Sequence, residues 1–314
     1  MRTQRKLTDR RRGRRATTGP RLGLAAVAMA LALAGCQSLG NAPGDTPDAV
    51  VPGGAPDAGA PLLQIEVSGG FVMMGYDFSR VPELTVYADG RAIVQGPQIA
   101  IYPAPALPNL QVEQLSEADV EALVAAARDA GLLAEPPVYG QPPIADAPST
   151  FVRLTVDGRT YEHAANALGL VDGEGTTGEG AVGAGGSGGS GMTEDERAAR
   201  VALAGFVATA NELVGATGNG ESYEITGFGV FAQPVPDGAG TTADGLEIQV
   251  LPWPIDLALA DAARCTVVDG EAAQTLLATL AGASSVTQFE QDGVTYNVWF
   301  RPLLPHESGC EGLG

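Results

Sequence analysis

The chain has 314 residues, of which 45 % are hydrophobic and only 5 % aromatic, and its formal net charge is −19. This hydrophobic share is enough for a folded, mainly aliphatic core. The acidity argues against a nucleic-acid-binding protein, because phosphate backbones attract basic surfaces and repel acidic ones.

Residues 1–35 have the pattern of an export signal. Residues 1–21 carry nine basic side chains and one acid, and the uncharged stretch 22–35 is rich in Ala and Leu. A helix rises about 1.5 Å per residue and a bilayer core is about 30 Å thick, so this stretch is too short for a comfortable membrane span. The pair Arg14-Arg15 leaves twin-arginine export open beside the general secretory route.

The apolar stretch ends in Leu33-Ala34-Gly35-Cys36, which resembles the lipobox of bacterial lipoproteins. The resemblance implies cleavage before Cys36 and acyl chains on that residue, which would anchor the protein to the outer face of the cell membrane. An ordinary secretory signal with an incidental cysteine is the alternative. Loss of the signal would leave 9 basic and 36 acidic residues, a net charge of −27.

Two stretches are too poor in apolar residues to build a core. Residues 36–61 are dominated by Gly, Pro, Ala and Asp, and we expect a disordered tether between the anchor and the folded part. Residues 172–191 are rich in Gly and Ser, and we expect a flexible surface loop.

Residues 62–217 predict an N-terminal α+β subdomain. Its strands are expected at 62–67 and on both sides of two Asp-Gly turns, Asp89-Gly90 and Asp157-Gly158. Helix starts are indicated at Ser116 and Thr193, each of which has an acid three residues later.

Residues 218–314 predict a second α+β subdomain. A lone strand is expected at 248–251, a helix at 271–281, and a hairpin around Asp292-Gly293. Cys265 and Cys310 are expected to form a disulfide, since an exported protein meets oxidising conditions. Two buried free thiols are the alternative.

The predicted fold class is α+β, with antiparallel sheet built from Asp-Gly hairpins and about three helices packed on one face. Two packed subdomains divided near 215–220 are favoured over a single larger sheet.

The stretch Leu84-Thr85-Val86-Tyr87-Ala88-Asp89-Gly90 and the helix beginning Leu115-Ser116-Glu117 resemble secreted bacterial domains of unknown function. The similarity covers about residues 65–215 and rests on the order of elements. The ending Val298–Pro305 is similar to that of actinobacterial lipoproteins of unknown function. Neither resemblance implies an activity.

The sequence offers no motif for a cofactor or a metal. Lys6 is the only lysine and lies in the predicted signal, so no Walker A or Schiff-base lysine is expected in the mature chain. The Gly185–Gly189 stretch matches Gly-x-Ser-x-Gly, but it lacks the flanking strand and helix of a nucleophile elbow.

Three side chains are candidates for a functional role. His163 and His306 are the only histidines, and either is a catalytic candidate only if carboxylates lie beside it. Trp253, between two prolines, suggests a possible binding surface, with core packing as the alternative. We therefore expect a lipid-anchored, non-enzymatic binding or scaffold protein for an envelope protein or glycan. A cell-envelope hydrolase is the alternative.

We predict that Cys36→Ser prevents lipid attachment, so that the protein stays unprocessed or leaves the membrane fraction. Fractionation of native-host cells followed by intact-mass measurement tests this. A Ser variant of mature size that still fractionates with membranes would contradict the lipid assignment.

Overall fold

The computed structural model describes residues 59–170, 191–215, 220–236, 245 and 247–310. The expected signal, most of the expected tether and nearly all of the Gly/Ser loop therefore lie outside the described residues, as does Cys36. Within the described part the predicted α+β class is confirmed, and the strands form two separate sheets.

The first sheet has the strand order β6-β5-β1-β2-β3-β4-β7 among the described residues, and every neighbouring pair is antiparallel. The first strand of the chain thus lies inside the sheet, between β5 and β2. The strands are β1 (Leu63–Ser68), β2 (Leu84–Val86), β3 (Arg91–Gln95), β4 (Leu110–Gln114), β5 (Ser149–Val156), β6 (Arg159–Asn166) and β7 (Glu221–Ser222).

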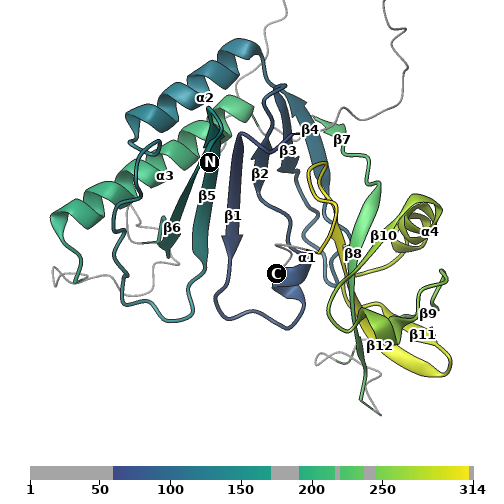
Figure 1. The fold of residues 1–314 in the computed structure, drawn as a ribbon. Coiled ribbons are helices and arrows are strands. Elements are labelled where there is room, and N and C mark those ends of the chain that lie inside the picture. Colours follow the sequence, from purple (N-terminus) through teal and green to yellow (C-terminus); the bar gives the residue numbers. More distant parts are fainter. Residues whose placement is uncertain (1–58, 171–190, 216–219, 237–244, 246, 311–314) are drawn as a thin grey trace, which may run out of the picture. The chain divides into compact units, whose positions relative to one another are not determined.

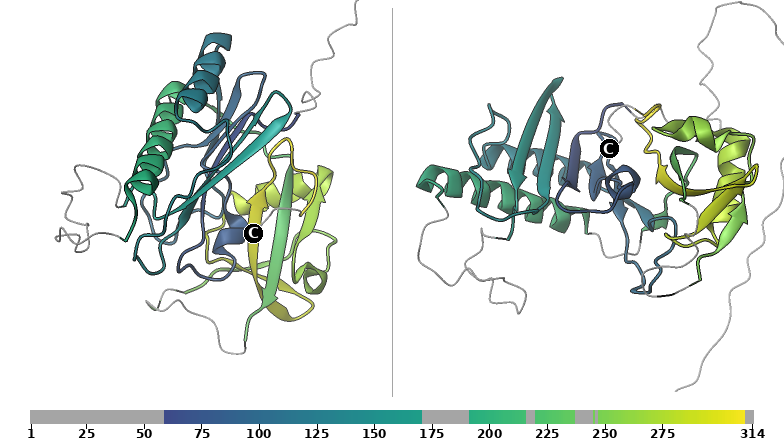
Figure 2. Two further views of the ribbon diagram at one scale, coloured as in Figure 1. Left: turned by 60° about the vertical axis from the view of Figure 1, so that its left-hand side comes forward. Right: turned by 90° about the horizontal axis from the view of Figure 1, so that it is seen from below.

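Two long helices, α2 (Glu117–Asp129) and α3 (Glu194–Val214), cover one face of this sheet (Figures 1 and 2). Each begins at a capping box, Ser116 with Asp119 and Thr193 with Glu196. The cap side chains accept hydrogen bonds from backbone N–H groups that the first helical turn leaves without partners. Both predicted helix starts are confirmed.

The first core lies between these helices and the sheet. Leu123 of α2 and Leu203 and Phe206 of α3 pack against inward-facing strand residues such as Ile65 and Leu154. Strand residues alternate between the two faces of a sheet, so the residues next to these point to the opposite face. That opposite face carries the polar side chains of β1 and β5.

The second sheet has the order β10-β8-β12-β11-β9 in the described part of the chain. Its strands are β8 (Gly227–Pro234), β9 (Val250–Pro252), β10 (Thr266–Asp269), β11 (Gln288–Gln291) and β12 (Val294–Pro302). Helix α4 (Gly270–Leu280) and the short 3₁₀ helix η1 (Leu259–Ala262) pack on it. The pair β9–β11 is parallel, whereas the other pairs are antiparallel.

The second core is separate from the first. Leu276 and Leu280 of α4 meet Phe228, Phe289 and Phe300 of the sheet. The three phenylalanine rings approach one another edge to face, with centroids 5.6 and 6.4 Å apart, a geometry that aromatic pairs prefer.

Asp-Gly pairs connect three of the antiparallel strand pairs. Between β5 and β6, Asp157 and Gly158 have φ angles of 51° and 73°, and between β11 and β12, Asp292 and Gly293 have 53° and 76°. Two successive positive φ angles match the right-handed twist of the paired strands.

Several elements differ from the sequence-based expectations. Strands β4, β8 and β10 and the short helix α1 (Tyr76–Ser79) were not expected. Strand β7 pairs with β4, so the first sheet extends beyond the boundary expected at residue 217. The strand expected at 248–251 is not alone but pairs with β11.

A disulfide joins Cys265, just before β10, to Cys310, with Cα atoms 5.9 Å apart. The predicted pairing is confirmed. This bridge holds the end of the segment that follows β12, residues 303–310, which we call the C-terminal segment.

We predict that reduction lowers the free energy of unfolding by about 4 kcal/mol, from the entropy regained by a loop of this length. Denaturant unfolding with and without reductant measures this, and Cys310→Ser should match the reduced protein. Two free thiols in the intact mass of the exported protein would contradict the pairing.

Candidate functional site

The face of the first sheet opposite α2 and α3 is covered over only part of its width. Leu304 of the C-terminal segment is buried against Val81, Tyr87, Ile93 and Leu110, on and beside β2, β3 and β4. The remaining part, on β1, β5 and β6, is lined mainly by polar side chains.

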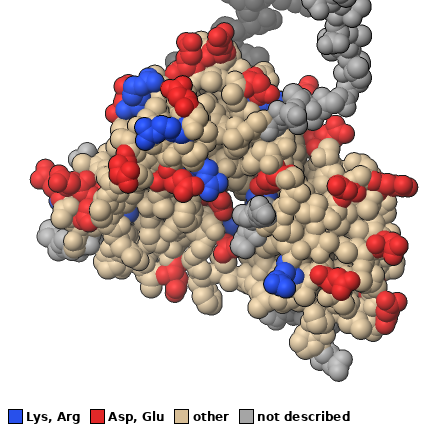
Figure 3. Space-filling view, in the orientation of Figure 1, with Lys and Arg blue, Asp and Glu red and all other residues tan. Residues whose placement is uncertain are grey.

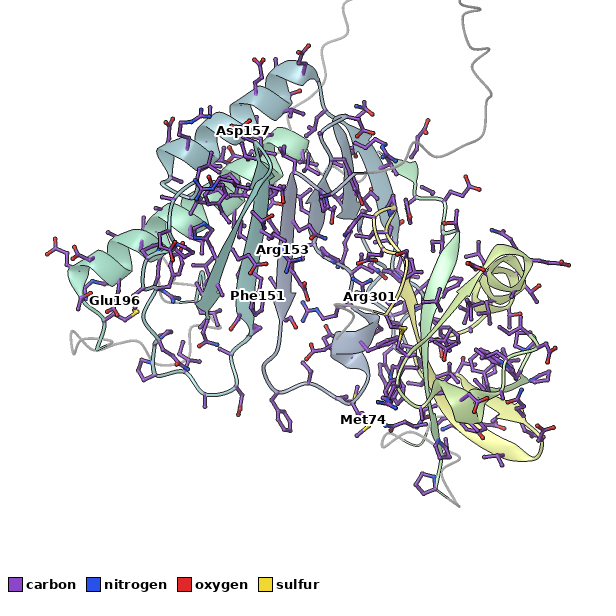
Figure 4. All side chains as sticks on the ribbon, in the orientation of Figure 1. Met74, Phe151, Arg153, Asp157, Glu196 and Arg301 are labelled. Atoms are coloured by element: carbon purple, nitrogen blue, oxygen red, sulfur yellow. A yellow bond between two sulfur atoms is a disulfide. The ribbon has the colours of Figure 1, made fainter. Side chains whose placement is uncertain are left out.

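We call this uncovered strip the polar groove. It consists of two hollows of about 750 and 630 Å³ that share three lining residues, Gln64, Glu66 and Arg153. Ser68, Phe151, Thr155, Thr160 and Glu162 also line it from the sheet, and His306 to Cys310 line it from the C-terminal segment. Figure 4 shows Phe151 and Arg153 on β5 and Arg301 on β12.

The C-terminal segment is held against the first sheet by a buried ion pair. Arg301 donates from both terminal nitrogens to the two carboxylate oxygens of Glu307, at 2.7 and 2.8 Å. The side chains are only 6 % and 11 % exposed. Arg301 Nε donates to the Arg80 carbonyl at 2.7 Å, and Glu307 also accepts from the Leu304 N–H at 2.8 Å.

The segment is further fixed by hydrogen bonds along its backbone. Tyr223 donates its hydroxyl to the Leu303 carbonyl at 2.8 Å, and the Leu303 N–H donates to Gly227 at 3.0 Å. Burial, with the nearby Glu307 carboxylate, raises the pKa of Tyr223 to about 12, so the phenol stays protonated as this donor. The groove therefore has one rigid wall.

His306 points from this wall into a hydrogen-bonded chain. Arg153 Nη1 donates to Gln64 Oε1 at 3.4 Å, the Gln64 amide lies 3.1 Å from His306 Nε2, and His306 Nδ1 lies 2.8 Å from the Tyr87 hydroxyl. With Gln64 Oε1 accepting from Arg153, the amide N–H donates to Nε2, and Nδ1–H points to Tyr87. Both ring nitrogens are thus engaged within the protein.

Burial lowers the pKa of His306 below its ordinary value of 6.5, with the Arg301 charge acting in the same direction and Glu307 opposing it. Its imidazole is therefore neutral at pH 7. Burial, with the charges of Tyr223 and Glu307, raises the pKa of Tyr87. In this series of hydrogen-bonded side chains, Arg153 is therefore the only fully charged group, and it lies at the end that lines the groove.

The groove carries mixed charges in an acidic surrounding. Arg153 pairs with Glu162 at 2.8 Å, and both side chains are more than half exposed. A second acid on this face, Glu66, borders both hollows, whereas Glu162 borders one of them. Figure 3 shows acidic side chains scattered over this side of the molecule, with few basic ones among them.

The second histidine has a structural role. His163 is 1 % exposed; its Nε2 lies 2.9 Å from the Leu132 carbonyl and its Nδ1 lies 2.7 Å from the Tyr139 hydroxyl. One nitrogen donates and the other accepts, which satisfies a neutral imidazole. The ring thus fixes the loop after α2 to β6 and faces the helix side of the sheet.

Trp253, the possible binding surface of the sequence analysis, packs into the second core. Its indole N–H donates to the Leu257 carbonyl at 2.8 Å, and its ring packs against Phe289 and Phe300 with centroids 5.4 and 6.3 Å away. The side chain is a partly buried member of the second core. This position agrees with core packing, the alternative role given for Trp253 in the sequence analysis.

The positions of the other residues singled out in the sequence follow directly from the structure. Cys265 and Cys310 are joined, and Cys310 lines the groove. Cys36 and Gly185–Gly189 lie outside the described residues. Where the chain is described, no group of three His, Cys, Asp or Glu side chains could hold a metal ion, and no helix is long and apolar enough to cross a bilayer.

Sequence reasoning missed the groove, because its residues are far apart in the chain. The sequence predicted strands at β1 and β5, but nothing in it showed which face of their sheet stays uncovered. No protein-family model, curated protein or solved structure matches this chain. What the groove does rests on the chemistry of its own residues.

We predict that Glu307→Gln lowers the free energy of unfolding by about 3 kcal/mol, because it leaves the buried Arg301 charge without a counter-charge. The double change Arg301→Met with Glu307→Leu removes both charges and should cost clearly less. Urea denaturation measures both.

The matched control is Glu162→Gln, which breaks the exposed pair with Arg153 and should cost less than about 1 kcal/mol. Equal losses for Glu307→Gln and Glu162→Gln would mean that the buried pair does not hold the C-terminal segment.

Proposed function

We propose that the protein is a lipid-anchored binding protein of the cell envelope, held to the membrane through Cys36, whose polar groove binds an extended neutral glycan. The observation that carries the binding site is the uncovered polar strip of β1, β5 and β6, bounded by a wall that a disulfide and a buried ion pair hold in place.

The lining of the groove favours a polyhydroxylated ligand. Gln64, Ser68, Thr155 and Thr160 offer neutral donors and acceptors, which suit hydroxyl groups. The Phe151 ring, 43 % exposed, offers an apolar surface on which one face of a sugar ring can pack.

Charge favours a neutral glycan over an anionic polymer. Glu66 and Glu162 line the groove with a single exposed cation, Arg153, which is already paired. The predicted mature chain also has an excess of acids. Phosphate- or carboxylate-rich polymers would therefore be repelled on approach.

A cell-envelope hydrolase is the second candidate. It is favoured by one observation, that His306, Glu307 and Ser308 line the same hollow. Against it, Glu307 is bonded to Arg301 and both nitrogens of His306 are engaged. A general base needs a free lone pair within reach of its substrate, and this arrangement offers none.

The binding proposal predicts that Phe151→Ala and Arg153→Ala each weaken binding of a fluorescently labelled, neutral envelope glycan by about tenfold, or about 1.4 kcal/mol. Fluorescence anisotropy with the mature protein measures this.

Arg159→Ala is the matched control, because Arg159 is an exposed arginine of the adjacent strand that does not line either hollow. Unchanged affinity in both groove variants would contradict the glycan site. Time-dependent shortening of the glycan, abolished by His306→Gln, would favour the hydrolase instead.

A further inference from the structure

The loop between β1 and α1, residues 69–75, and the first residue of α1, Tyr76, expose an unusual run of large apolar side chains; we call residues 69–76 the apolar loop. Phe71 is 89 % exposed, Met73 82 % and Met74 65 %, and Val72 and Tyr76 are exposed beside them. Residues 67–76 contain no charged side chain. Contiguous exposed apolar groups of this kind mark interaction sites.

The apolar loop is fixed at both ends by close packing. At Gly70, with φ of 86°, an added Cβ would lie 2.9 Å from the Asp146 carbonyl oxygen, and at Gly75, with φ of 77°, it would overlap the Trp299 ring. The Phe71 N–H donates to Asp146 at 3.3 Å and the Tyr76 N–H to Met73 at 3.1 Å. The backbone is thus held while its tip side chains point away from the protein.

This close packing requires glycine at both ends of the loop. The two ends therefore lie against the rest of the folded protein, while the apolar side chains between them stay exposed. Trp299 stacks on Phe231, with centroids 5.0 Å apart, and both belong to the cluster with Phe78. The loop is therefore supported by a packed part of the second sheet. Figure 4 labels Met74 beside α1 and β12.

We propose that the apolar loop inserts its tip, Phe71, Met73 and Met74, into the surface of the membrane that carries the Cys36 lipid. The inference rests on the proposed lipid anchor. Residues 37–61 separate the anchor from β1; if they form the tether that the sequence predicts, their root-mean-square span would be about 28 Å. Strand β1 adds about 20 Å at most, so the loop lies within reach of the bilayer.

The chemistry of the loop suits a bilayer surface. No charge has to leave water when the tip inserts, and Tyr76 stays at its base with the Arg80 guanidinium 5.3 Å above its ring. Aromatic rings and arginine are favoured at the level of the lipid headgroups. Asp77 and Asp146 flank the base, so insertion stops at the tip. The tether also keeps the loop at a high effective concentration near the membrane.

The test uses mature lipidated protein in phosphatidylcholine–phosphatidylglycerol vesicles whose phosphatidylcholine carries bromine on its acyl chains. In Phe71→Trp, the added emission should shift to the blue and lose most of its intensity, because bromine quenches tryptophan within the bilayer. Wild type supplies the background of Trp253 and Trp299. Val201→Trp, at a 56 % exposed position of α3, is the control and should not be quenched.

A second measurement needs no variant of the loop. Met73 and Met74 should be oxidised by peroxide several-fold more slowly in the vesicle-bound lipidated protein than in Cys36→Ser protein in solution. Flotation of the same samples reports anchoring separately.

If the protein floats with vesicles but Phe71→Trp is not quenched and both methionines oxidise at the solution rate, the loop inference is overturned and the anchor stands. If the protein does not float, the anchor proposal fails and the inference falls with it. Protection that appears without vesicles and grows with protein concentration would assign the loop to contacts between copies of this chain, and would also overturn membrane insertion.

Discussion

The bidentate ion pair between Arg301 and Glu307 fixes the relation between the second sheet and the uncovered face of the first. Arg301 is the second-last residue of β12, and its Nε donates to the carbonyl of Arg80, which precedes β2. Glu307 also accepts from the Leu304 N–H and so turns the C-terminal segment back on itself. Taking two charges out of water is costly, and only a nearly complete set of hydrogen bonds offsets that cost. The buried ion pair therefore restricts the C-terminal segment to the arrangement in which these hydrogen bonds are made.

The position of His306 follows from the same arrangement. The residue is next to Glu307 in the chain, so the turn held by the ion pair brings its ring to Tyr87 and Gln64. The disulfide at Cys310 holds the far end of the segment beside β10. A covalent bond and a buried charge pair thus secure one wall of the groove at two points, which suits a preformed site that loses little freedom on binding.

The polar groove and the apolar loop have opposite surface chemistry, although strand β1 contributes to the groove and leads directly into the loop. Strand β1 presents Gln64 and Glu66 to the groove, and the chain that follows it presents Phe71 and Met73 to its surroundings. A polar, mixed-charge surface suits a hydroxyl-rich ligand, whereas an uncharged apolar tip suits a bilayer. If Cys36 carries the proposed lipid, the protein would have use for both, since contact with the membrane would limit the directions in which its groove faces.

The sequence by itself determined the local elements of this protein. Capping boxes at Ser116 and Thr193 predicted two helix starts, and alternation at 62–67 predicted strand β1, because hydrogen bonds and periodicity of this kind act within a few residues. The pairing of Cys265 with Cys310 was predicted correctly, since only two cysteines follow Cys36. Strand β8, Gly227–Pro234, was missed because buried side chains on both of its faces erase the alternation.

Only the tertiary structure decided what those elements do together. The insertion of β1 between β5 and β2, the packing of Leu304 on part of one sheet face, and the partial burial of Trp253 all depend on contacts between residues far apart in the chain. His163 and His306 looked equivalent in the sequence, yet the His163 ring is buried against Tyr139 and Leu132. The His306 ring instead bonds to Gln64 and Tyr87 beside the groove. Local patterns report which face of a strand is polar, but the three-dimensional packing decides whether that face is left open to a ligand.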